Sequence, residues 1–254
     1  MPRSDPIRDR YYKSVERAYR ATEALFYAGA LLSFGSVLVN QETFPRLYEN
    51  VLILFVLDVA SFFVLGMLTR FYFTPRAEQK RRQDFLTHAF GVSLTYENTV
   101  DYYNNDFGDA SKKLGAQVLE NSFFSKELVR RAAYFERIRT VGYFIVWSVL
   151  LVSRRTDYGV VLAATQAVFS EQILSKLIRL EWFRAKCEKV HDDVYRLFQS
   201  SAAVDKFLPM ALESLLLYET AKSNAGIVIP SGLFHRANRE LSAQWQEIRS
   251  RLNL

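Results

Sequence analysis

Side chains that could carry acid–base or metal chemistry are few and scattered along this chain of 254 residues. The three histidines, His88, His191 and His235, lie far apart and have no partners at the spacing of metal ligands. His191 is followed by Asp192 and Asp193, a run that could help to bind the metals of a phosphate-ester hydrolase. Such a site needs further His and Asp ligands that the chain lacks, so a solvated helix face is the favoured interpretation. We therefore expect no enzymatic activity, no metal and no cofactor.

The single cysteine, Cys187, excludes an internal disulfide and a zinc site of several cysteines. The neighbouring cations Arg184, Lys186 and Lys189 are expected to lower the pKa of its thiol. No catalytic partner is evident in the sequence, so a structural or exposed thiol is favoured over a nucleophile.

Asp58 is the most informative carboxylate, because it lies inside the apolar run Val51–Leu68. A charge at the centre of a bilayer costs about 3 kcal/mol unless it faces other helices or water. Two interpretations stay open: a pore-lining or gating acid, or a contact between helices to Gln166 or Ser148. Gln166 and Glu171 are weaker candidates for the same intramembrane polar seam. Glycines on the first two apolar runs, at positions 29, 35 and 66, could allow helices to approach closely.

The most distinctive polar cluster consists of Tyr102, Tyr103, Asn104, Asn105 and Asp106. Two aromatic rings beside amides and a carboxylate could stack on a nucleotide base and bind its edge. The alternative is an Asx-rich turn that the two tyrosines anchor. Ligand binding at this cluster is therefore a hypothesis.

The apolar residues, half of the chain, are concentrated in four runs although the mean hydropathy is only -0.05. These runs are Ala24–Val39, Val51–Leu68, Val141–Val152 and Gly159–Phe169. A helix needs about 20 residues to cross the hydrocarbon core. The first pair approaches this length, whereas the second pair needs polar flanks and local thinning of the bilayer. The alternative for the second pair is a soluble hairpin packed on its neighbours.

The net charge of +6 comes from Lys and Arg residues that collect beside the apolar runs. The links expected outside hold only Arg46, Arg154 and Arg155, of which the last two are discordant. The positive-inside rule then places both termini and the central segment in the cytoplasm of a multi-pass inner-membrane protein. This placement favours a lipid bilayer over DNA as the partner of the basic residues.

The predicted fold class is all-α, an integral membrane protein with four spanning helices in two hairpins and long helices extending into the cytoplasm. We expect a cytoplasmic N-terminal helix at 1–21, a transmembrane hairpin at 22–73 and a cytoplasmic insert at 74–139. A second transmembrane hairpin is expected at 140–174 and a cytoplasmic helical region at 175–254.

Proline and turn-forming residues indicate where the expected helices end or bend. Pro75 is expected to kink or end the second helix just beyond the membrane. Turn formers predict a loop at Tyr96–Asp109 and a break at Lys222–Gly232. A final helix over Leu241–Leu252 is expected to present Trp245 on its apolar face.

The order of span pair, cytoplasmic insert, span pair and cytoplasmic helices resembles the bacterial four-transmembrane effectors linked to CBASS, the cyclic-oligonucleotide anti-phage signalling, and to SMODS-type nucleotidyltransferases. The resemblance covers most of the chain and rests on layout, with Arg82–Phe90 and Tyr218–Ile229 as the segments most similar to the family. It implies a homo-oligomeric, pore-forming effector in antiviral defence. It also implies that a cyclic nucleotide or oligonucleotide from a partner nucleotidyltransferase binds the cytoplasmic part.

Two other functions stay open. A non-pore membrane scaffold or regulator would recruit a cytoplasmic partner through its helical extensions. A soluble helical interaction protein would bury the apolar runs in a core.

Overall fold

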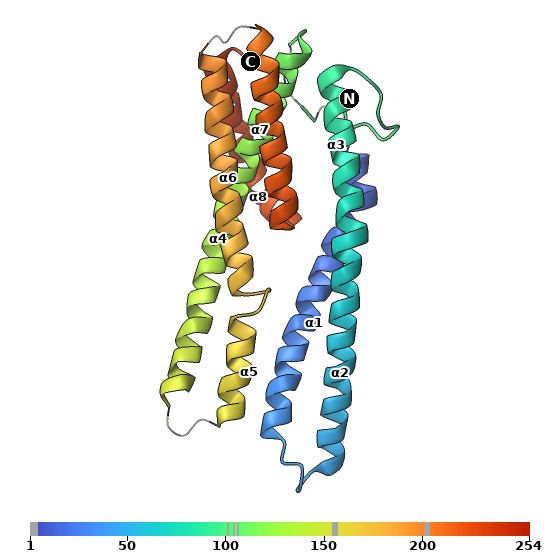
Figure 1. Ribbon diagram of the computed structural model, residues 1–254, viewed down its shortest axis with the longest axis vertical. Coiled ribbons are helices and arrows are strands. Elements are labelled where there is room, and N and C mark those ends of the chain that lie inside the picture. Colours follow the sequence, from blue (N-terminus) through green and yellow to red (C-terminus); the bar gives the residue numbers. More distant parts are fainter. Residues whose placement is uncertain (1–4, 101, 104, 106, 154–156, 201–203) are drawn as a thin grey trace. The chain divides into compact units, whose positions relative to one another are not determined.

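The computed structural model describes residues 5–100, 102–103, 105, 107–153, 157–200 and 204–254 (Figure 1). The regular structure of these described residues is entirely helical, which confirms the all-α prediction. The elements are η1 (Arg8–Tyr12), α1 (Lys13–Leu38), α2 (Pro45–Leu68), η2 (Thr69–Phe73), α3 (Thr74–Phe90), α4 (Ala110–Val152), α5 (Tyr158–Val168), α6 (Leu174–Gln199), α7 (Val204–Ala225) and α8 (Ser231–Leu252).

The chain forms two compact units. The first, here called the bundle unit, comprises Met1–Lys13, Pro75–Ala133 and Arg179–Leu254. The second, the hairpin unit, comprises Ser14–Thr74 and Tyr134–Ile178. Each unit is therefore assembled from segments that are distant in sequence, and the long helices α4 and α6 each contribute residues to both units.

Two helical stretches are long and apolar enough to cross a membrane. They are Arg8–Leu38, with 31 residues, and Pro45–Phe90, with 46 residues. Figure 1 shows their apolar parts, α1 and α2, running side by side from the turn that joins them. The expectation of apolar spans is thus confirmed for the first hairpin.

The second hairpin is shorter than expected, and four spanning helices are not confirmed. The fourth run, expected to extend to Leu174, is helical only over Tyr158–Val168. Its 11 residues rise only about 16 Å, roughly half of the hydrocarbon core. The polar run Ser170–Gln172 lies in the break between α5 and α6. Polar side chains can form hydrogen bonds with nearby backbone groups and so compete with the helical hydrogen bonds.

Pro75 does not end the second helix, contrary to that part of the expectation. A proline lacks the N–H of a helical hydrogen bond and its ring clashes with the carbonyl four residues earlier. Just before Pro75 the helix widens into the π-helical turn η2, where the Thr74 N–H donates to the carbonyl of Thr69. This wider turn lets the helical path continue from α2 into α3.

The core of the bundle unit forms where the first half of α4 meets α6, α7 and α8. Its fully buried side chains include Leu119, Val190, Val194, Leu241 and Trp245. The last helix begins at Ser231, ten residues before the predicted start, because Pro230 immediately precedes its first turn.

Gly115 on α4 provides a first prediction about this core. A Cβ atom there would lie 2.9 Å from Cε1 of the Phe207 ring. Gly115→Ala is therefore expected to destabilise the protein by about 1–3 kcal/mol through overpacking. The matched control is Gly142→Ala on the same helix, where an added Cβ meets no atom within 4 Å. Thermal unfolding of the purified variants measures the difference, and equal effects would contradict the packing argument.

Candidate functional site

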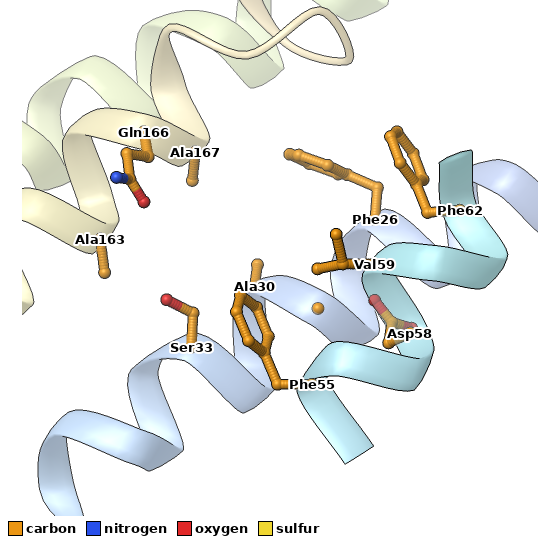
Figure 2. Close-up of a pocket in the computed structure, with 11 residues that line it drawn as sticks. Phe26, Ala30, Ser33, Phe55, Asp58, Val59, Phe62, Ala163, Gln166 and Ala167 are labelled. Atoms are coloured by element: carbon orange, nitrogen blue, oxygen red, sulfur yellow. The ribbon is translucent and has the colours of Figure 1, made fainter. Parts of the chain in front are cut away.

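The hairpin unit contains an open cavity of about 170 Å³. Its lining residues are Phe26, Gly29, Ala30 and Ser33 of α1, Phe55, Asp58, Val59 and Phe62 of α2, and Ala163, Gln166 and Ala167 of α5 (Figure 2). Asp58 and Gln166, which sequence analysis assigned to one polar seam, therefore line the same cavity. Glu171 lies in the turn after α5 and Ser148 lies on α4, and neither lines it.

Asp58 packs against the glycine of the neighbouring helix. A Cβ atom built on Gly29 would lie 2.5 Å from Oδ2 of Asp58, so any larger residue would displace the carboxylate. Gly66, in contrast, has no atom within 4 Å of such a Cβ. Of the glycines noted in the sequence, Gly29 is thus the one that makes room for the acid.

The rest of the cavity wall is mainly aromatic and aliphatic. The rings of Phe26 and Phe62 lie 6.5 Å apart between centroids, and Phe55 contributes a third ring. The remaining polar side chains are Ser33 and Gln166, which Figure 2 shows on the opposite side of the view from Asp58. The cavity therefore combines one carboxylate and two neutral polar groups with an apolar wall.

A second group of charges joins α1, α4 and the start of α6. Lys176 Nζ lies 2.8 Å from Oε1 of Glu136 and 3.2 Å from Oε1 of Glu23. Arg139 Nη2 lies 3.4 Å from Oε1 of Glu23, and Arg139 Nε lies 3.2 Å from Oε2 of Glu136. Two acids and two bases thus balance each other, and we call them the charge cluster.

The charge cluster is largely shielded from solvent. The side chains of Lys176 and Glu136 are only 11% and 13% exposed. Burial alone would lower the pKa of Lys176, but Tyr19 and the carboxylates of Glu136 and Glu23 outweigh it and raise that pKa. Lys176 and Arg139 belong to the basic residues beside the apolar runs, and their pairing with Glu23 leaves no local signal, because Glu23 lies more than a hundred residues away from both.

The loop after α3 is anchored to the bundle unit through Asp84, which is fully buried. The Thr99 backbone N–H donates to its Oδ1 over 2.9 Å, and the Thr99 hydroxyl donates to its Oδ2 over 2.8 Å. His88 Nε2 lies 3.4 Å from Oδ1. Burial would raise the pKa of Asp84, but the bonds from His88 and Thr99 outweigh it and lower that pKa.

The aromatic members of the polar cluster in this loop contact their own chain. The Arg81 guanidinium lies 4.7 Å from the ring centroid of Tyr102. Tyr103 packs edge-on against Phe85 and His88. Asn105 is half-buried, and Asn104 and Asp106 lie outside the described residues. Nucleotide binding by these residues stays a prediction.

Two expectations about reactive side chains were wrong. Cys187 is buried, and desolvation raises the pKa of its thiol to about 12 instead of the expected lowering by neighbouring cations. His191 is also buried, where it contacts Lys126 and Asp192, so it does not lie on a solvated helix face. Among the described residues, no group of three His, Cys, Asp or Glu side chains could hold a metal ion.

The outer surface of the hairpin unit is strongly apolar. No residue of α2 is buried, although this helix is the most apolar of the first hairpin. Exposed large apolar side chains include Leu31 and Leu38 on α1, Ile53, Leu54, Val56, Leu57, Phe63 and Val64 on α2, Phe135, Ile138, Val141, Ile145, Val146, Val149 and Val152 on α4, and Leu162 on α5. Both hairpins thus expose apolar faces.

Comparison of the chain with protein-family models, with curated proteins and with solved structures found no match.

The charge cluster generates a second prediction. Lys176→Met leaves the two glutamates with one cation, so it is expected to cost about 3 kcal/mol of unfolding free energy. The double variant Lys176→Met, Glu136→Leu restores charge balance and is expected to recover part of that loss. The control, Arg20→Met, removes an exposed ion pair with Glu16 and is expected to change little. Thermal unfolding measures these losses of stability. A double variant that is no more stable than Lys176→Met alone would contradict the coupling between the two residues.

The Asp84–His88 pair generates a third prediction, on pH. Asp84 raises the pKa of His88 above its ordinary value of 6.5, so the protonated ring stabilises the fold below that pH. This contribution is lost as the pH rises through the folded-state pKa. His88→Gln is therefore expected to cost about 1–2 kcal/mol near pH 6 and less near pH 9. Thermal unfolding at both pH values, with the exposed His235→Gln as control, tests this. Equal losses at both pH values would contradict it.

Proposed function

We propose that this chain is a membrane effector that oligomerises and permeabilises the bacterial inner membrane when it is activated. The observation that carries the proposal is the apolar outer surface of the hairpin unit, together with an open cavity that Asp58 lines. Monomeric soluble proteins rarely expose apolar patches of more than a few hundred Å². The hydrocarbon core of a lipid bilayer around both hairpins would account for that apolar surface.

The second hairpin enters the bilayer together with the first in this proposal. The exposed apolar residues of α4 extend from Tyr134 to Val152, which is about 28 Å of helix. The shorter α5 packs beside α4, since the Trp147 indole donates to the Thr165 hydroxyl over 2.8 Å. Local thinning of the bilayer around α5 would bring water toward the cavity. Both termini and the central segment stay in the cytoplasm, in keeping with the basic flanks.

The cavity is the proposed origin of the conducting path. A carboxylate inside a spanning segment is costly, and it is retained where it faces a polar or water-filled space. In a single chain the cavity holds three polar side chains, Asp58, Ser33 and Gln166, which are too few to line a continuous path. Oligomerisation would bring several such groups together, so self-association is part of the proposal.

The proposed trigger is a cyclic nucleotide or oligonucleotide from a partner nucleotidyltransferase, acting in anti-phage defence. This part rests on the resemblance in layout. A ligand shifts the protein toward the conducting state only if it binds that state more tightly than the resting one. Arg81 supports a site on the bundle unit, because its guanidinium lies beside the rings of Tyr12 and Tyr102 and its Nη1 has no hydrogen-bond partner, whereas its Nη2 donates to both carboxylate oxygens of Asp5.

A fourth prediction tests the proposal in liposomes. The full chain, reconstituted in bacterial polar lipids, is expected to release trapped K⁺ when one of a set of cyclic di- and trinucleotides of adenosine and guanosine is added. Asp58→Asn is expected to reduce that release at least several-fold, because it removes the only acidic side chain among the described residues of the cavity wall. Glu49→Gln, which removes an exposed acid on the same helix, serves as the control.

Ion release at background level with every nucleotide would contradict the proposal. The scaffold hypothesis predicts a different pattern, in which substitutions on the bundle unit abolish function while Asp58→Asn has no effect. Recovery of the protein in the supernatant after cell fractionation without detergent would contradict both hypotheses and support the soluble interaction protein.

A further inference from the structure

We propose that the cavity of the hairpin unit is a binding site for a small organic cation, an ammonium group that carries apolar substituents. The Asp58 carboxylate would balance its charge, and the rings of Phe26, Phe55 and Phe62 would contact its apolar part. This inference goes beyond the proposed function, because it concerns occupancy of the cavity and requires no ion flow.

The charge of the ligand follows from the surroundings of Asp58. Among the residues that the structure describes, no Lys, Arg or His lines the cavity, and no hydrogen bond or ion pair joins Asp58 to another of them. This contrasts with the charge cluster, where each carboxylate faces two cations. A carboxylate that is partly withdrawn from water, as the half-buried Asp58 is, is stabilised by a partner of opposite charge. Asp58 therefore favours a cation and disfavours an anion.

The wall of the cavity favours an organic cation over a metal ion. The polar side chains on it belong to Asp58, Ser33 and Gln166, whereas Ca²⁺ takes six to eight oxygen ligands and Mg²⁺ requires six. Three phenylalanine rings form part of the remaining wall. Aromatic faces attract ammonium groups electrostatically, and they contact methyl or methylene groups without a desolvation cost.

The volume indicates the size of the ligand part that the cavity can hold. An engineered protein cavity of about 150 Å³ holds one benzene molecule. The cavity here, of about 170 Å³, is therefore suited to roughly seven to ten non-hydrogen atoms. Choline, a trimethylammonium with a short hydroxyl-bearing chain, falls in this range. Its uncharged counterpart of the same shape is 3,3-dimethylbutan-1-ol, so the two compounds separate charge from size.

The test is a calorimetric titration of the full chain in a maltoside detergent that contains no choline lipid. Choline chloride is expected to bind saturably with one molecule per chain, and 3,3-dimethylbutan-1-ol at least about tenfold more weakly. Asp58→Asn, which keeps the shape of the side chain, is expected to weaken choline binding by about tenfold or more. Phe55→Leu is expected to weaken the binding of choline more than the binding of the alcohol, because it removes the aromatic ring but keeps an apolar side chain. The control Glu49→Gln is expected to leave binding unchanged.

A short-chain phosphatidylcholine, titrated in parallel, distinguishes a free ammonium compound from a lipid headgroup as the source. Binding of either that depends on Asp58 supports the site. Equal affinity for choline and its uncharged counterpart, equal effects of Asp58→Asn and Glu49→Gln, or no saturable binding of either compound would overturn the proposal. The readout is binding in detergent, so its failure would leave the liposome result unaffected.

Discussion

The apolar surface that the hairpin unit leaves uncovered is the constraint on which the other features depend. Helix α2 has no buried residue, and it carries exposed apolar side chains from Leu47 to Leu68, while Phe55 and Phe62 line the cavity. A helix satisfies its own backbone hydrogen bonds, so it can present such a surface to hydrocarbon. Every polar side chain in this unit then needs a partner, a cavity or a place at the boundary with water.

The charged side chains of the hairpin unit meet this requirement in two ways. At the charge cluster, Lys176 and Arg139 balance Glu23 and Glu136 within hydrogen-bonding distance, so burial leaves no net charge. Asp58 instead lies against Gly29 at the wall of a cavity, and none of the described residues that line this cavity is a cation. The balanced cluster joins helices, whereas the unbalanced acid is the group with which a mobile ion or ligand would interact.

The bundle unit uses polar groups for a different purpose. Asp84 is fully buried in the core. Three donor groups, two from Thr99 and one from His88, lie around its carboxylate and hold the loop that follows α3 in place. Tyr103 of that loop packs on Phe85, so part of the sequence that looked available for a ligand contributes to folding. Arg81 and the ring of Tyr102 hold the next part of the loop in the same way. A ligand at this site would have to compete with, or rearrange, these contacts.

The sequence alone determined the helical class, the apolar runs of the first hairpin and the position of Asp58 within one of them, because clustering of apolar residues and an acid within them are local properties. Only the tertiary structure decided the partners. Gln166 reaches the cavity of Asp58 because α5 lies beside α1, and Lys176 meets Glu23 across 153 positions. Burial likewise reversed the expected pKa shift of Cys187. These outcomes depend on which helices pack together, and a pattern along one segment carries no information about its distant neighbours.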